Sequence, residues 1–432
     1  MGLIASQEKL EIANRARIDK NWSRQDPKLL LEATVGLETL KRFWRGKTPI
    51  KEDNFKEICR ALGVDWKEIV DWGKSRKNRV EENEKICLKE DCDEMPDVLV
   101  FYGREKEIQD IKKSILDNRS RALVLCGQPG IGKTALAAKL AEKVKSDFEC
   151  FCWRSLNYSS PPTLSELLSG LIKFLSSEEN NSLPSNVDDL IKKLLQIFSN
   201  RRILLVIDSW EKILRVQNIK GCQTDYDKYS ELLKQIAERR HKSYVIITTQ
   251  EEPKELSLLK TRSSINLIQL TGLDFEAGLK ILEERQLTFI PEQAKKLINR
   301  DYNGNPLELI HICEHIASVF AGSLTQYEIN HTYLVPQSFQ SAINEICKNL
   351  SDLEAQILQI IATESKPIEY EKLKLQILQN YSEVSNSSLQ INLSLLLKRS
   401  LIQISSQGNK VLYYLQPTIG KCIIKIYNLT NH

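Results

Sequence analysis

The residues with the clearest chemistry lie in LVLCGQPGIGKTALAAKL, at positions 123–140. Gly127, Gly132, Lys133 and Thr134 satisfy the pattern G-x-x-x-x-G-K-[ST], and Gly130 lies between them. Glycines let a loop curl until its backbone N–H groups point inward and hold an anion. A lysine here reaches the outer phosphates of a nucleotide, and the threonine hydroxyl ligates Mg²⁺. The segment therefore predicts a nucleotide-binding loop.

A magnesium-binding acid is expected on a neighbouring strand. The apolar run ILLVID ends at Asp208, and such a strand can bring a carboxylate to the metal ion beside the loop. The alternative is that Asp208 only caps the following helix. Another run, YVIITT (244–249), ends in hydroxyls that we expect near the outer phosphate.

These groups need strands and helices to position them. LVLC fits a strand that is buried on both faces, and ALAAKLAEKV after the loop has strong helix propensity. Strand-like and helix-like segments alternate between residues 120 and 270. This pattern predicts a multidomain α/β protein built around a doubly wound parallel sheet.

The composition limits the class of protein. A chain of 432 residues is long enough for roughly three domains, and 41% hydrophobic with 27% charged residues is typical of a soluble globular protein. The start MGLIASQEKL is not a secretion signal, so we expect a cytoplasmic location. The 10 cysteines lack a repeated C-x-x-C spacing, which favours reduced thiols over a disulfide framework.

The N-terminal region is basic and helical. Residues 1–80 carry 18 Lys and Arg against 12 Asp and Glu, a net +6 that leaves −2 for the rest of the chain. Asp26 and Pro27 predict the cap and first residue of a helix. A turn near 34–36 and a second helix at about 37–44 follow, which resembles the Cro/repressor-type helix-turn-helix.

Two interpretations of this region stay open. One is DNA binding through residues 20–60, with Lys41 and Arg42 on phosphates and the second helix in the major groove. The other is a helical adaptor or self-association domain, because Leu37 and Glu38 begin the second helix and read bases poorly.

The C-terminal region predicts helices followed by a β-hairpin. Leu353, Ile357, Ile360 and Ile361 have helical spacing, and LIQISS pairs with VLYYLQP across Gly408-Asn409. Helices followed by such a hairpin are typical of a winged helix. Because basic residues are sparse here apart from Lys398-Arg399, we favour an internal clamp over a DNA reader.

The order of the motifs resembles the NB-ARC branch of the STAND class of P-loop ATPases. The resemblance covers about residues 98–425 and rests on FYGREKEI, GQPGIGKT, VIDSWE, IITTQ and YNGNPLELI. It implies a nucleotide between the P-loop sheet, a helical domain and the winged helix, with FYGRE near the adenine and the proline of GNP on the base. It also implies that ADP holds the chain closed, and that exchange for ATP opens it for self-assembly.

The resemblance carries over to specific positions. Lys133, Asp208 and Glu211 are the candidate catalytic residues, and Thr134 and Asp208 are the expected Mg²⁺ ligands. The residues expected to bind ATP or ADP are Tyr102, Gly103, Arg104, Gly127, Gln128, Pro129, Gly130, Ile131, Gly132, Lys133, Thr134, Ala135, Asp208 and Pro306.

Several positions depart from the family pattern. Ser209 replaces a frequent second acid, Gln250 stands where an arginine is common, and Gln416-Pro417 falls where some relatives have His-Asp. Glu211 could orient a water, but an exposed helix carboxylate is the interpretation we favour. Because losing a positioned polar group reduces turnover by about 10²–10³-fold, we expect a weak ATPase at most.

The expected domains are a helix-turn-helix-like effector or adaptor (1–80), an acidic linker (81–97), the P-loop domain (98–270), a helical domain (271–340) and a winged helix (341–432). The expected function is an ADP/ATP signalling switch that self-assembles. Alternatives are a STAND-type transcription regulator and a constitutive AAA+-type ATPase. Members of this family commonly continue into repeats that sense a ligand. Because we find no 30–45-residue repeat in this sequence, we expect the sensor to be missing, separately encoded or replaced by the N-terminal domain.

Overall fold

The computed structural model describes residues 2–6, 9–48, 50–71, 89–116, 120–176, 183–217, 223–253, 256, 264–330, 334–364, 366–380, 384–408 and 410–429. The chain forms two compact units, Met1–Leu88 and Lys89–His432. Residues 81–88 of the predicted linker and Asn409 of the predicted turn lie outside the described residues.

The first unit is a small helical domain around its own apolar core. Its elements are β1 (Gly2–Leu3), α1 (Leu10–Asp19), α2 (Pro27–Glu32), α3 (Leu37–Arg45), β2 (Ile50–Lys51), α4 (Glu52–Leu62) and α5 (Trp66–Ile69). The predicted cap of α2 is confirmed, because the Asp26 carboxylate accepts a hydrogen bond from the backbone N–H of Lys28 at 2.9 Å. Leu29 and Ala33 are fully buried. Thr34 in the turn has a φ of 49°, a left-handed conformation that a β-branched residue seldom adopts.

The second unit is built on a six-stranded parallel sheet in the order β3-β5-β6-β7-β4-β8. Its strands are β3 (Lys89–Asp91), β4 (Ala122–Cys126), β5 (Cys150–Ser155), β6 (Ile203–Asp208), β7 (Tyr244–Thr249) and β8 (Ile265–Gln269). Every residue of β4, β6 and β7 is buried, as central strands covered on both faces require. The predicted doubly wound α/β sheet is confirmed.

The edge strand β3 lies inside the segment 81–97, which the sequence pattern indicated as a linker. Lys89, Glu90 and Asp91 pair in parallel with Cys150, Phe151 and Cys152 of β5. Its side chains are charged, and those of Lys89 and Glu90 are exposed, so they gave no strand signal, although charged residues are usual on edge strands.

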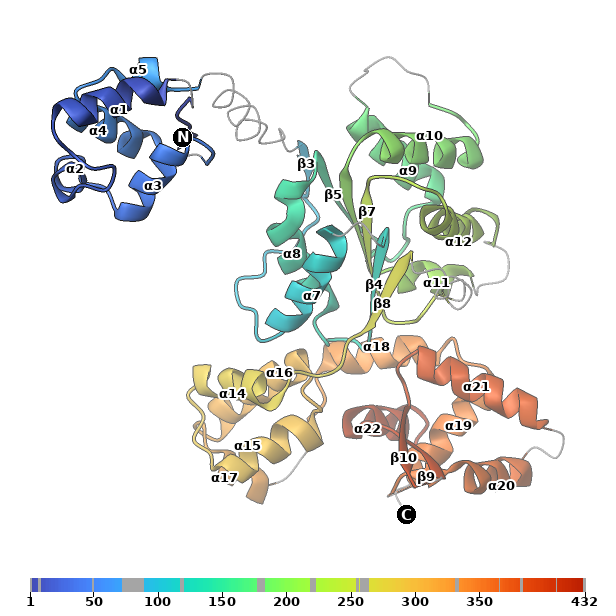
Figure 1. Ribbon diagram of the computed structural model, residues 1–432. Coiled ribbons are helices and arrows are strands. Elements are labelled where there is room, and N and C mark those ends of the chain that lie inside the picture. The colour runs from blue at the N-terminus through green and yellow to red at the C-terminus, as the bar shows by residue number, and fades with distance from the viewer. Residues whose placement is uncertain are drawn as a thin grey trace. The chain divides into compact units, whose positions relative to one another are not determined.

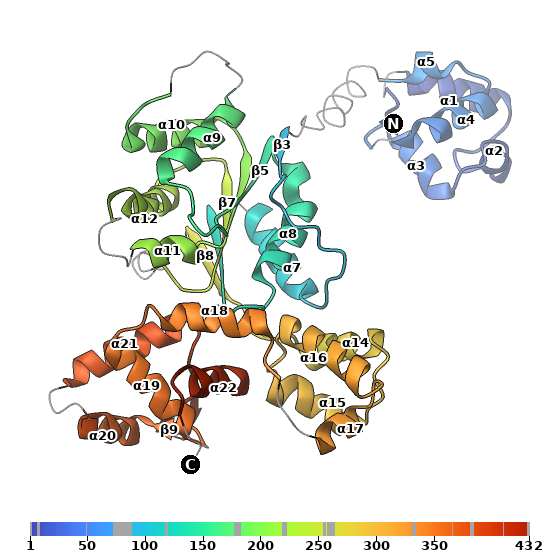
Figure 2. The ribbon, with the colours of Figure 1, turned by 180° about the vertical axis from the view of Figure 1, so that it is seen from behind.

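Helices cover both faces of the sheet, with α7 and α8 on one side and α9, α10, α11 and α12 on the other (Figure 1, and from behind in Figure 2). Their bounds are α7 (Glu105–Leu116), α8 (Lys133–Val144), η1 (Lys145–Asp147), α9 (Leu164–Leu175), α10 (Val187–Asn200), α11 (Glu211–Gln217) and α12 (Gln223–Glu238). Thr163 and Glu166 form a capping box at the start of α9. The apolar faces of α9, α10 and α12 join the sheet in one core.

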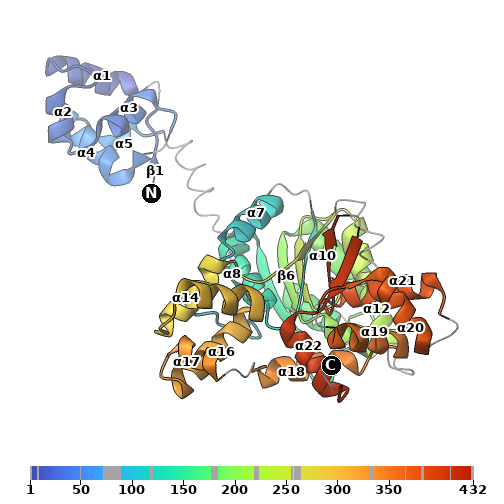
Figure 3. The ribbon, with the colours of Figure 1, turned by 90° about the horizontal axis from the view of Figure 1, so that it is seen from below.

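Two further helical groups follow the sheet and lie side by side (Figure 3). The first comprises α14 (Phe275–Glu284), α15 (Pro291–Lys295), the π-helical turn η3 (Lys296–Asp301), α16 (Pro306–Val319) and α17 (Leu324–Ile329). The second comprises α18 (Gln337–Cys347), α19 (Asp352–Thr363), β9 (Ile368–Glu369), α20 (Tyr370–Asn380), α21 (Asn386–Lys398), β10 (Gln403–Gln407), β11 (Lys410–Tyr414) and α22 (Pro417–Ile426). Each group has its own apolar cluster.

The predicted C-terminal hairpin is present, because β10 pairs with β11 from Gln403↔Tyr414 to Gln407↔Lys410 and β11 also pairs with β9. Within the described part of the chain, no helix combines the length and apolar character needed to span a bilayer. The described cysteines are free, and most of them are buried.

Candidate functional site

The phosphate-binding loop connects β4 to α8 and has the backbone that the glycine pattern predicts. Gly127, Gly130 and Gly132 have φ values of 157°, 74° and 94°, in the region that residues with a side chain rarely adopt. Gly132 is the N-cap of α8, so the positive end of the helix lies behind the loop. The backbone N–H of Gly127 donates to the carbonyl of Thr249 at 3.3 Å and ties the loop to β7.

The start of α16 packs directly on this loop. The Asn305 side-chain amide donates to the Pro129 carbonyl at 3.0 Å. A Cβ on Gly130 would lie 2.8 Å from Leu307 Cβ, and a Cβ on Gly132 would lie 3.9 Å from Pro306 Cγ. Asn305 and Pro306 therefore bring the GNP motif of the helical segment against the phosphate loop.

Lys133 lies inside the curl of the loop. Its ammonium donates to the carbonyls of Gly127 at 2.9 Å and Gln128 at 2.8 Å, and the residue is 8% exposed. Burial lowers the pKa of Lys133, while the charge of Glu211 is the strongest influence that raises it. The loop therefore surrounds an ammonium group with backbone dipoles, the arrangement that binds phosphate oxygens.

Asp208 and two hydroxyl groups form an oxygen cluster beside the loop. Asp208 Oδ1 accepts hydrogen bonds from Thr134 Oγ1 at 2.7 Å and from Thr248 Oγ1 at 2.6 Å. Thr248 Oγ1 in turn accepts from the backbone N–H of Ser209 at 2.9 Å. The strands β6 and β7 thus bring together the acid and the hydroxyl group that the sequence pattern placed at their ends.

Glu211 is not the exposed helix carboxylate that the sequence analysis favoured. It is 4% exposed, and its Oε2 accepts a hydrogen bond from the backbone N–H of Gln250 at 3.2 Å. Ser209, with a φ of 66°, introduces a left-handed turn between β6 and α11. This turn directs Glu211 toward the sheet edge, which helix periodicity alone could not predict.

Arg104 and Tyr102 hold the entry segment FYGRE against its neighbours. The Arg104 guanidinium is buried and donates to the carbonyls of Ile131 at 3.1 Å and Thr271 at 2.7 Å; burial lowers its pKa. Tyr102 donates its hydroxyl hydrogen bond to Glu284 of α14. A Cβ on Gly103 would lie 2.9 Å from Ala277 Cβ.

A cavity of about 620 Å³ lies next to the loop. Gln128 and Ile131 of the loop, residues 269–273, two asparagines of the helical segment and side chains of the C-terminal segment line it. This volume is within the range of about 300–1,000 Å³ that is usual for small-molecule sites. Of the predicted nucleotide-binding residues, Gln128 and Ile131 line the cavity; Tyr102, Gly103, Arg104 and Pro306 are not among its lining residues.

Several lining residues were not predicted. Gln269 Nε2 donates to Ser400 Oγ at 2.9 Å, and Gln128 Nε2 donates to the Ser400 carbonyl at 3.0 Å. Asn299 reaches the cavity from the π-helical turn η3, an element often found at functional sites. Gln416, noted in the sequence only as a departure from the family pattern, also lines the cavity and is 5% exposed. Spacing gave no signal for Gln269, Asn299 or Ser400, which meet only by tertiary packing.

The C-terminal segment is attached to the sheet by a charged contact. Arg399 Nε lies 3.2 Å from Glu251 Oε2, just beyond β7, and its Nη1 pairs with Glu354 of α19. The three side chains are 13%, 13% and 4% exposed. The backbone N–H of Glu252 also donates to the Lys398 carbonyl at 3.2 Å.

The groups present fit a nucleotide with Mg²⁺. The loop offers inward-turned backbone and a buried ammonium to phosphates, and Gln128 Oε1 and Gln416 Oε1 are buried without a hydrogen-bond partner. Thr134 and Asp208 offer a hydroxyl and a carboxylate oxygen, the ligand types that Mg²⁺ prefers. The described residues include no cluster of three or more His, Cys, Asp or Glu able to hold a metal.

Comparisons with known proteins agree with this geometry. Residues 104–278 match the NB-ARC domain family. An uncharacterised WD repeat-containing protein of Nostoc sp. is 29% identical over 94% of this chain, which spans 35% of that protein's length. A ToMV resistance protein of Solanum lycopersicum is 35% identical over 20% of this chain and 10% of its own. A Walker-type ATPase of Pyrococcus abyssi shares the fold, with a TM-score of 0.51 and 13% identity over 75% of this chain and 96% of that one.

Proposed function

We propose that this chain is an ADP/ATP-operated signalling switch, because residues 104–278 match the NB-ARC domain family and carry a phosphate-binding loop. ADP holds the second unit in its compact form. Exchange for ATP releases the C-terminal segment and lets copies of the chain self-assemble, and slow hydrolysis restores the resting form.

One observation carries this proposal: the phosphate loop contacts both C-terminal helical groups. Asn305 of the first group bonds the loop at Pro129, and Ser400 of the second bonds it at Gln128. A change in the phosphates at the loop therefore alters contacts that hold both groups in place. Coupling between two sites needs this kind of differential contact.

The chain's own residues would act as follows. Lys133 would turn from the loop carbonyls to the outer phosphates, and Thr134 and Asp208 would hold Mg²⁺, which neutralises phosphate charge and orients the nucleotide when bound. Gln128, Ile131 and the 269–273 segment would enclose the rest of the ligand. Gln416 would contribute the contact that some relatives make with a histidine.

We further propose that hydrolysis is slow. Ser209 offers no carboxylate beside Asp208, and Gln250 offers its backbone N–H to Glu211 rather than a side-chain cation to the outer phosphate. Glu211 is buried and placed to support Lys133 electrostatically. We expect steady turnover well below about 1 s⁻¹, the low end of common enzyme rates.

The test is the nucleotide content of the purified full-length protein. After denaturation, chromatography should detect ADP at close to one molecule per chain, and loading with a slowly hydrolysed ATP analogue should increase the mass measured by light scattering. An empty protein that turns over added ATP rapidly and stays a monomer would contradict the switch. Lys133→Ala should lose the nucleotide. Lys143→Ala changes an exposed lysine of the same helix and is the matched control, which should keep it.

A second candidate is a DNA-binding regulator that uses the first unit. It is favoured by the two helices α2 and α3 joined by a tight turn, with exposed Arg42 and Arg45 on α3. In this case Lys41→Glu with Arg42→Glu should abolish a salt-dependent affinity for duplex DNA. Lys28→Glu with Lys67→Glu makes the same charge change elsewhere in the unit and should preserve it. Equal losses in both pairs would exclude specific readout by α3.

The domain assignment belongs to the same proposal. We assign a helix-turn-helix-like effector or adaptor to the first unit and a P-loop domain to the sheet. The group α14–α17 is then the helical domain, and α18–α22 with β9–β11 is the winged helix, which acts as an internal clamp through Arg399. An upstream sensor or downstream effector and a cytoplasmic location complete the proposal.

A further inference from the structure

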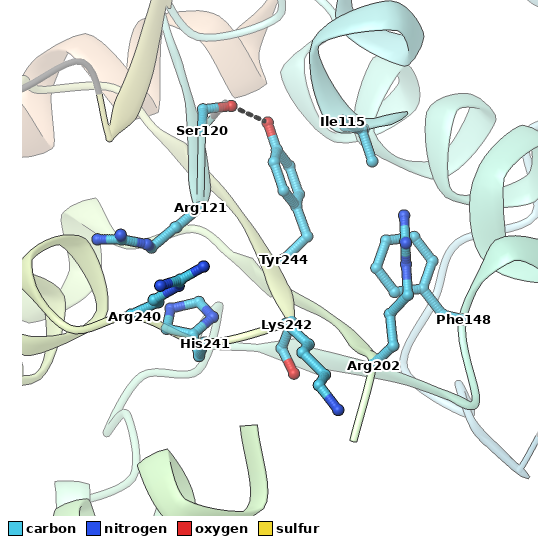
Figure 4. A pocket seen from close by; sticks show the side chains of 10 residues that line it. Ile115, Ser120, Arg121, Phe148, Arg202, Arg240, His241, Lys242 and Tyr244 are labelled. Carbon is cyan, nitrogen blue, oxygen red and sulfur yellow. Dashed lines mark hydrogen bonds between the residues drawn. The ribbon is translucent and has the colours of Figure 1, made fainter. Parts of the chain in front are cut away.

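A second cavity, of about 330 Å³, lies at the N-terminal ends of the parallel strands, and Figure 4 shows the side chains that line it. Arg121 comes just before β4, Arg202 just before β6, and residues 240–243 just before β7. Sequentially distant cations are therefore brought together by the parallel order of the strands. The cavity is on the other side of the sheet from the phosphate loop, which follows the end of β4.

An adjoining hollow of about 190 Å³ shares Arg240 and His241 with this cavity and adds Lys192 and Arg239. Among the residues that the structure describes, no carboxylate lines either hollow. The two hollows together form a basic site, which we define by Arg121, Arg202, Arg239, Arg240, His241 and Lys242.

Four cations of the basic site have no ion-pair partner among the residues that the structure describes. Among the described residues, no salt bridge involves Arg121, Arg202, Arg240 or Lys242. The nearby carboxylate of Glu149 is bound by the side chain of Arg201 and by the backbone N–H of Arg202. Positive charges held together without a counter-ion attract an anion strongly.

Several of these groups are held in fixed positions. Arg121 Nη1 donates to the Ala237 carbonyl at 2.7 Å, and His241 Nε2 lies 3.0 Å from the Ile236 carbonyl. The Arg202 guanidinium stacks on the Phe148 ring at 5.0 Å, and its Nε is buried without a hydrogen-bond partner. Figure 4 shows the Arg121, Arg240 and His241 side chains gathered on one side of Tyr244, and Arg202 against Phe148 on the other.

The last turn of α12 explains only part of this cluster. Arg121 and His241 satisfy carbonyls at its C-terminus, where cations are stabilised by the helix dipole. Arg202, Arg240 and Lys242 have no such contact through their side chains. A guanidinium with a buried, unpartnered nitrogen indicates a missing acceptor, because buried polar groups are normally hydrogen-bonded.

We propose that the basic site binds a small anion with at least two phosphate groups, one in each hollow, with Arg240 and His241 between them. Guanidinium groups bind phosphate oxygens in pairs of charge-assisted hydrogen bonds. Two hollows of this size accept a compact polyphosphorylated molecule rather than the extended backbone of a nucleic acid. The site is separate from the nucleotide site and independent of the proposed switch.

The test is calorimetry of inorganic tripolyphosphate binding to the full-length protein with saturating ADP, so that the phosphate loop is occupied. We expect one site whose affinity falls with salt. Arg240→Glu should weaken binding by about tenfold or more, because it removes a charge-assisted hydrogen bond and adds a repelling charge. Lys234→Glu makes the same charge change at an exposed position of α12 outside both hollows and should leave the affinity unchanged.

Binding of other ligands, measured by the same calorimetry, identifies the class of ligand. Glycerol 3-phosphate should bind much more weakly than tripolyphosphate; equal affinities would overturn the two-phosphate arrangement. Equal losses in Arg240→Glu and Lys234→Glu would reduce the effect to general attraction and overturn the site. Duplex DNA that binds with the same dependence on Arg240 and displaces tripolyphosphate would overturn the choice of a small ligand.

A spectroscopic readout is independent of affinity. Burial lowers the pKa of His241, and the positive charge of Arg121 lowers it further. A bound polyphosphate should therefore raise this pKa, seen as a shift in the imidazole titration by NMR. An unchanged titration at saturating tripolyphosphate would contradict binding at His241. Lys242→Glu provides a second variant if Arg240→Glu fails to fold.

Discussion

Lys133 is a buried ammonium whose protonation depends on its neighbours. Burial lowers its pKa, and the charges of Glu211, Cys126 and Asp208 oppose that shift, with Glu211 the largest of the three. An ammonium binds phosphate and the neutral amine does not. At the residue scale, the affinity of the site for nucleotide therefore depends on a carboxylate that belongs to α11.

A first prediction concerns the pH dependence of ADP affinity. The affinity should fall as pH rises through the depressed pKa of Lys133, because the protonated form is lost. Glu211→Gln keeps an acceptor for the Gln250 N–H but removes the charge, so the fall should occur at lower pH. Calorimetry between pH 6 and roughly pH 10 measures both profiles. This range lies below the ordinary lysine pKa of about 10.4, where a lowered pKa would be seen. If ADP affinity fell at the same pH in the wild type and in Glu211→Gln, Glu211 would not act on Lys133. Glu142→Gln on α8 is the control and should fall at the same pH as the wild type.

A second prediction concerns Glu308, which α16 buries completely. Burial raises its pKa from 4.5 to about 8. Between these values the folded chain holds a proton that the unfolded chain has lost. The contribution of the protonated Glu308 side chain to folding stability is therefore fully present below pH 4.5 and is lost as pH rises through about 8.

Denaturant unfolding of the wild type should show the free energy of unfolding falling over this window, by up to about 1.4 kcal/mol per pH unit for one proton. Glu308→Gln should remove this part of the slope. Glu314→Gln, an exposed carboxylate on the same helix, should retain it. A wild-type slope that persists in Glu308→Gln would assign the titration to another group.

At the element scale, the start of α16 and the phosphate loop form one packed unit, and this explains Gly130. A Cβ there would lie 2.8 Å from Leu307 Cβ and 2.9 Å from Asn305 Oδ1, and the φ of 74° adds strain. Gly130→Ala should separate loop and helix and lower ADP affinity by about tenfold or more, with a left-handed penalty of about 1–2 kcal/mol.

The matched control is Gly170→Ala within α9, where an added Cβ meets nothing within 4 Å. Alanine should stabilise that helix by about 0.5–1 kcal/mol without affecting ADP. Calorimetry and thermal melting of both variants measure the contrast. Unchanged ADP binding in Gly130→Ala would show that the contact with α16 is dispensable.

The clamp formed by Arg399 links three elements, since its partners Glu251 and Glu354 follow β7 and lie on α19. Removing one member of a fully buried ion pair typically costs about 3–5 kcal/mol; because Arg399 and Glu251 are each 13% exposed, that range is an upper limit for this network. Arg399→Met should therefore loosen the C-terminal segment. Release of a fluorescent ADP analogue should be faster by about tenfold or more, and self-assembly should occur without ATP.

Lys398→Met changes the adjacent cation and is the control for the clamp, because Glu251 and Glu354 form their salt bridges with Arg399. Its ADP release should match the wild type. If Arg399→Met released ADP at the same rate as the wild type and Lys398→Met, the C-terminal segment would be held by its apolar contacts and not by this ion network.

At the scale of the whole molecule, the second unit begins at Lys89 and includes β3, which precedes the P-loop domain proposed from residue 98. All residues of the nucleotide site belong to this unit. A fragment of residues 89–432 should therefore bind ADP as tightly as the full chain, measured by calorimetry. A fragment of residues 98–432 lacks β3 and exposes the edge of β5, so it should melt at a lower temperature. Equal melting temperatures would mean that β3 contributes nothing to the sheet.

Local sequence was sufficient for features that local physics controls. Glycine spacing predicted a tightly curled loop, and Gly127, Gly130 and Gly132 have positive φ values. Apolar runs predicted β4, β6 and β7, and Asp26-Pro27 predicted the start of α2. Each depends on backbone sterics, strand burial or capping within a few residues. The alternation of these segments was enough to predict a parallel α/β sheet.

Only tertiary structure decided which distant residues meet. The burial of Glu211 follows from a left-handed Ser209 and the neighbouring β7, and the cavity side chains Gln269, Asn299, Ser400 and Gln416 come from separate elements. The basic site exists because parallel strands begin at one edge, so cations separated by many residues become neighbours. Spacing in the sequence determines which way side chains point along one helix or strand. Strand order and helix packing determine how close residues on different elements lie.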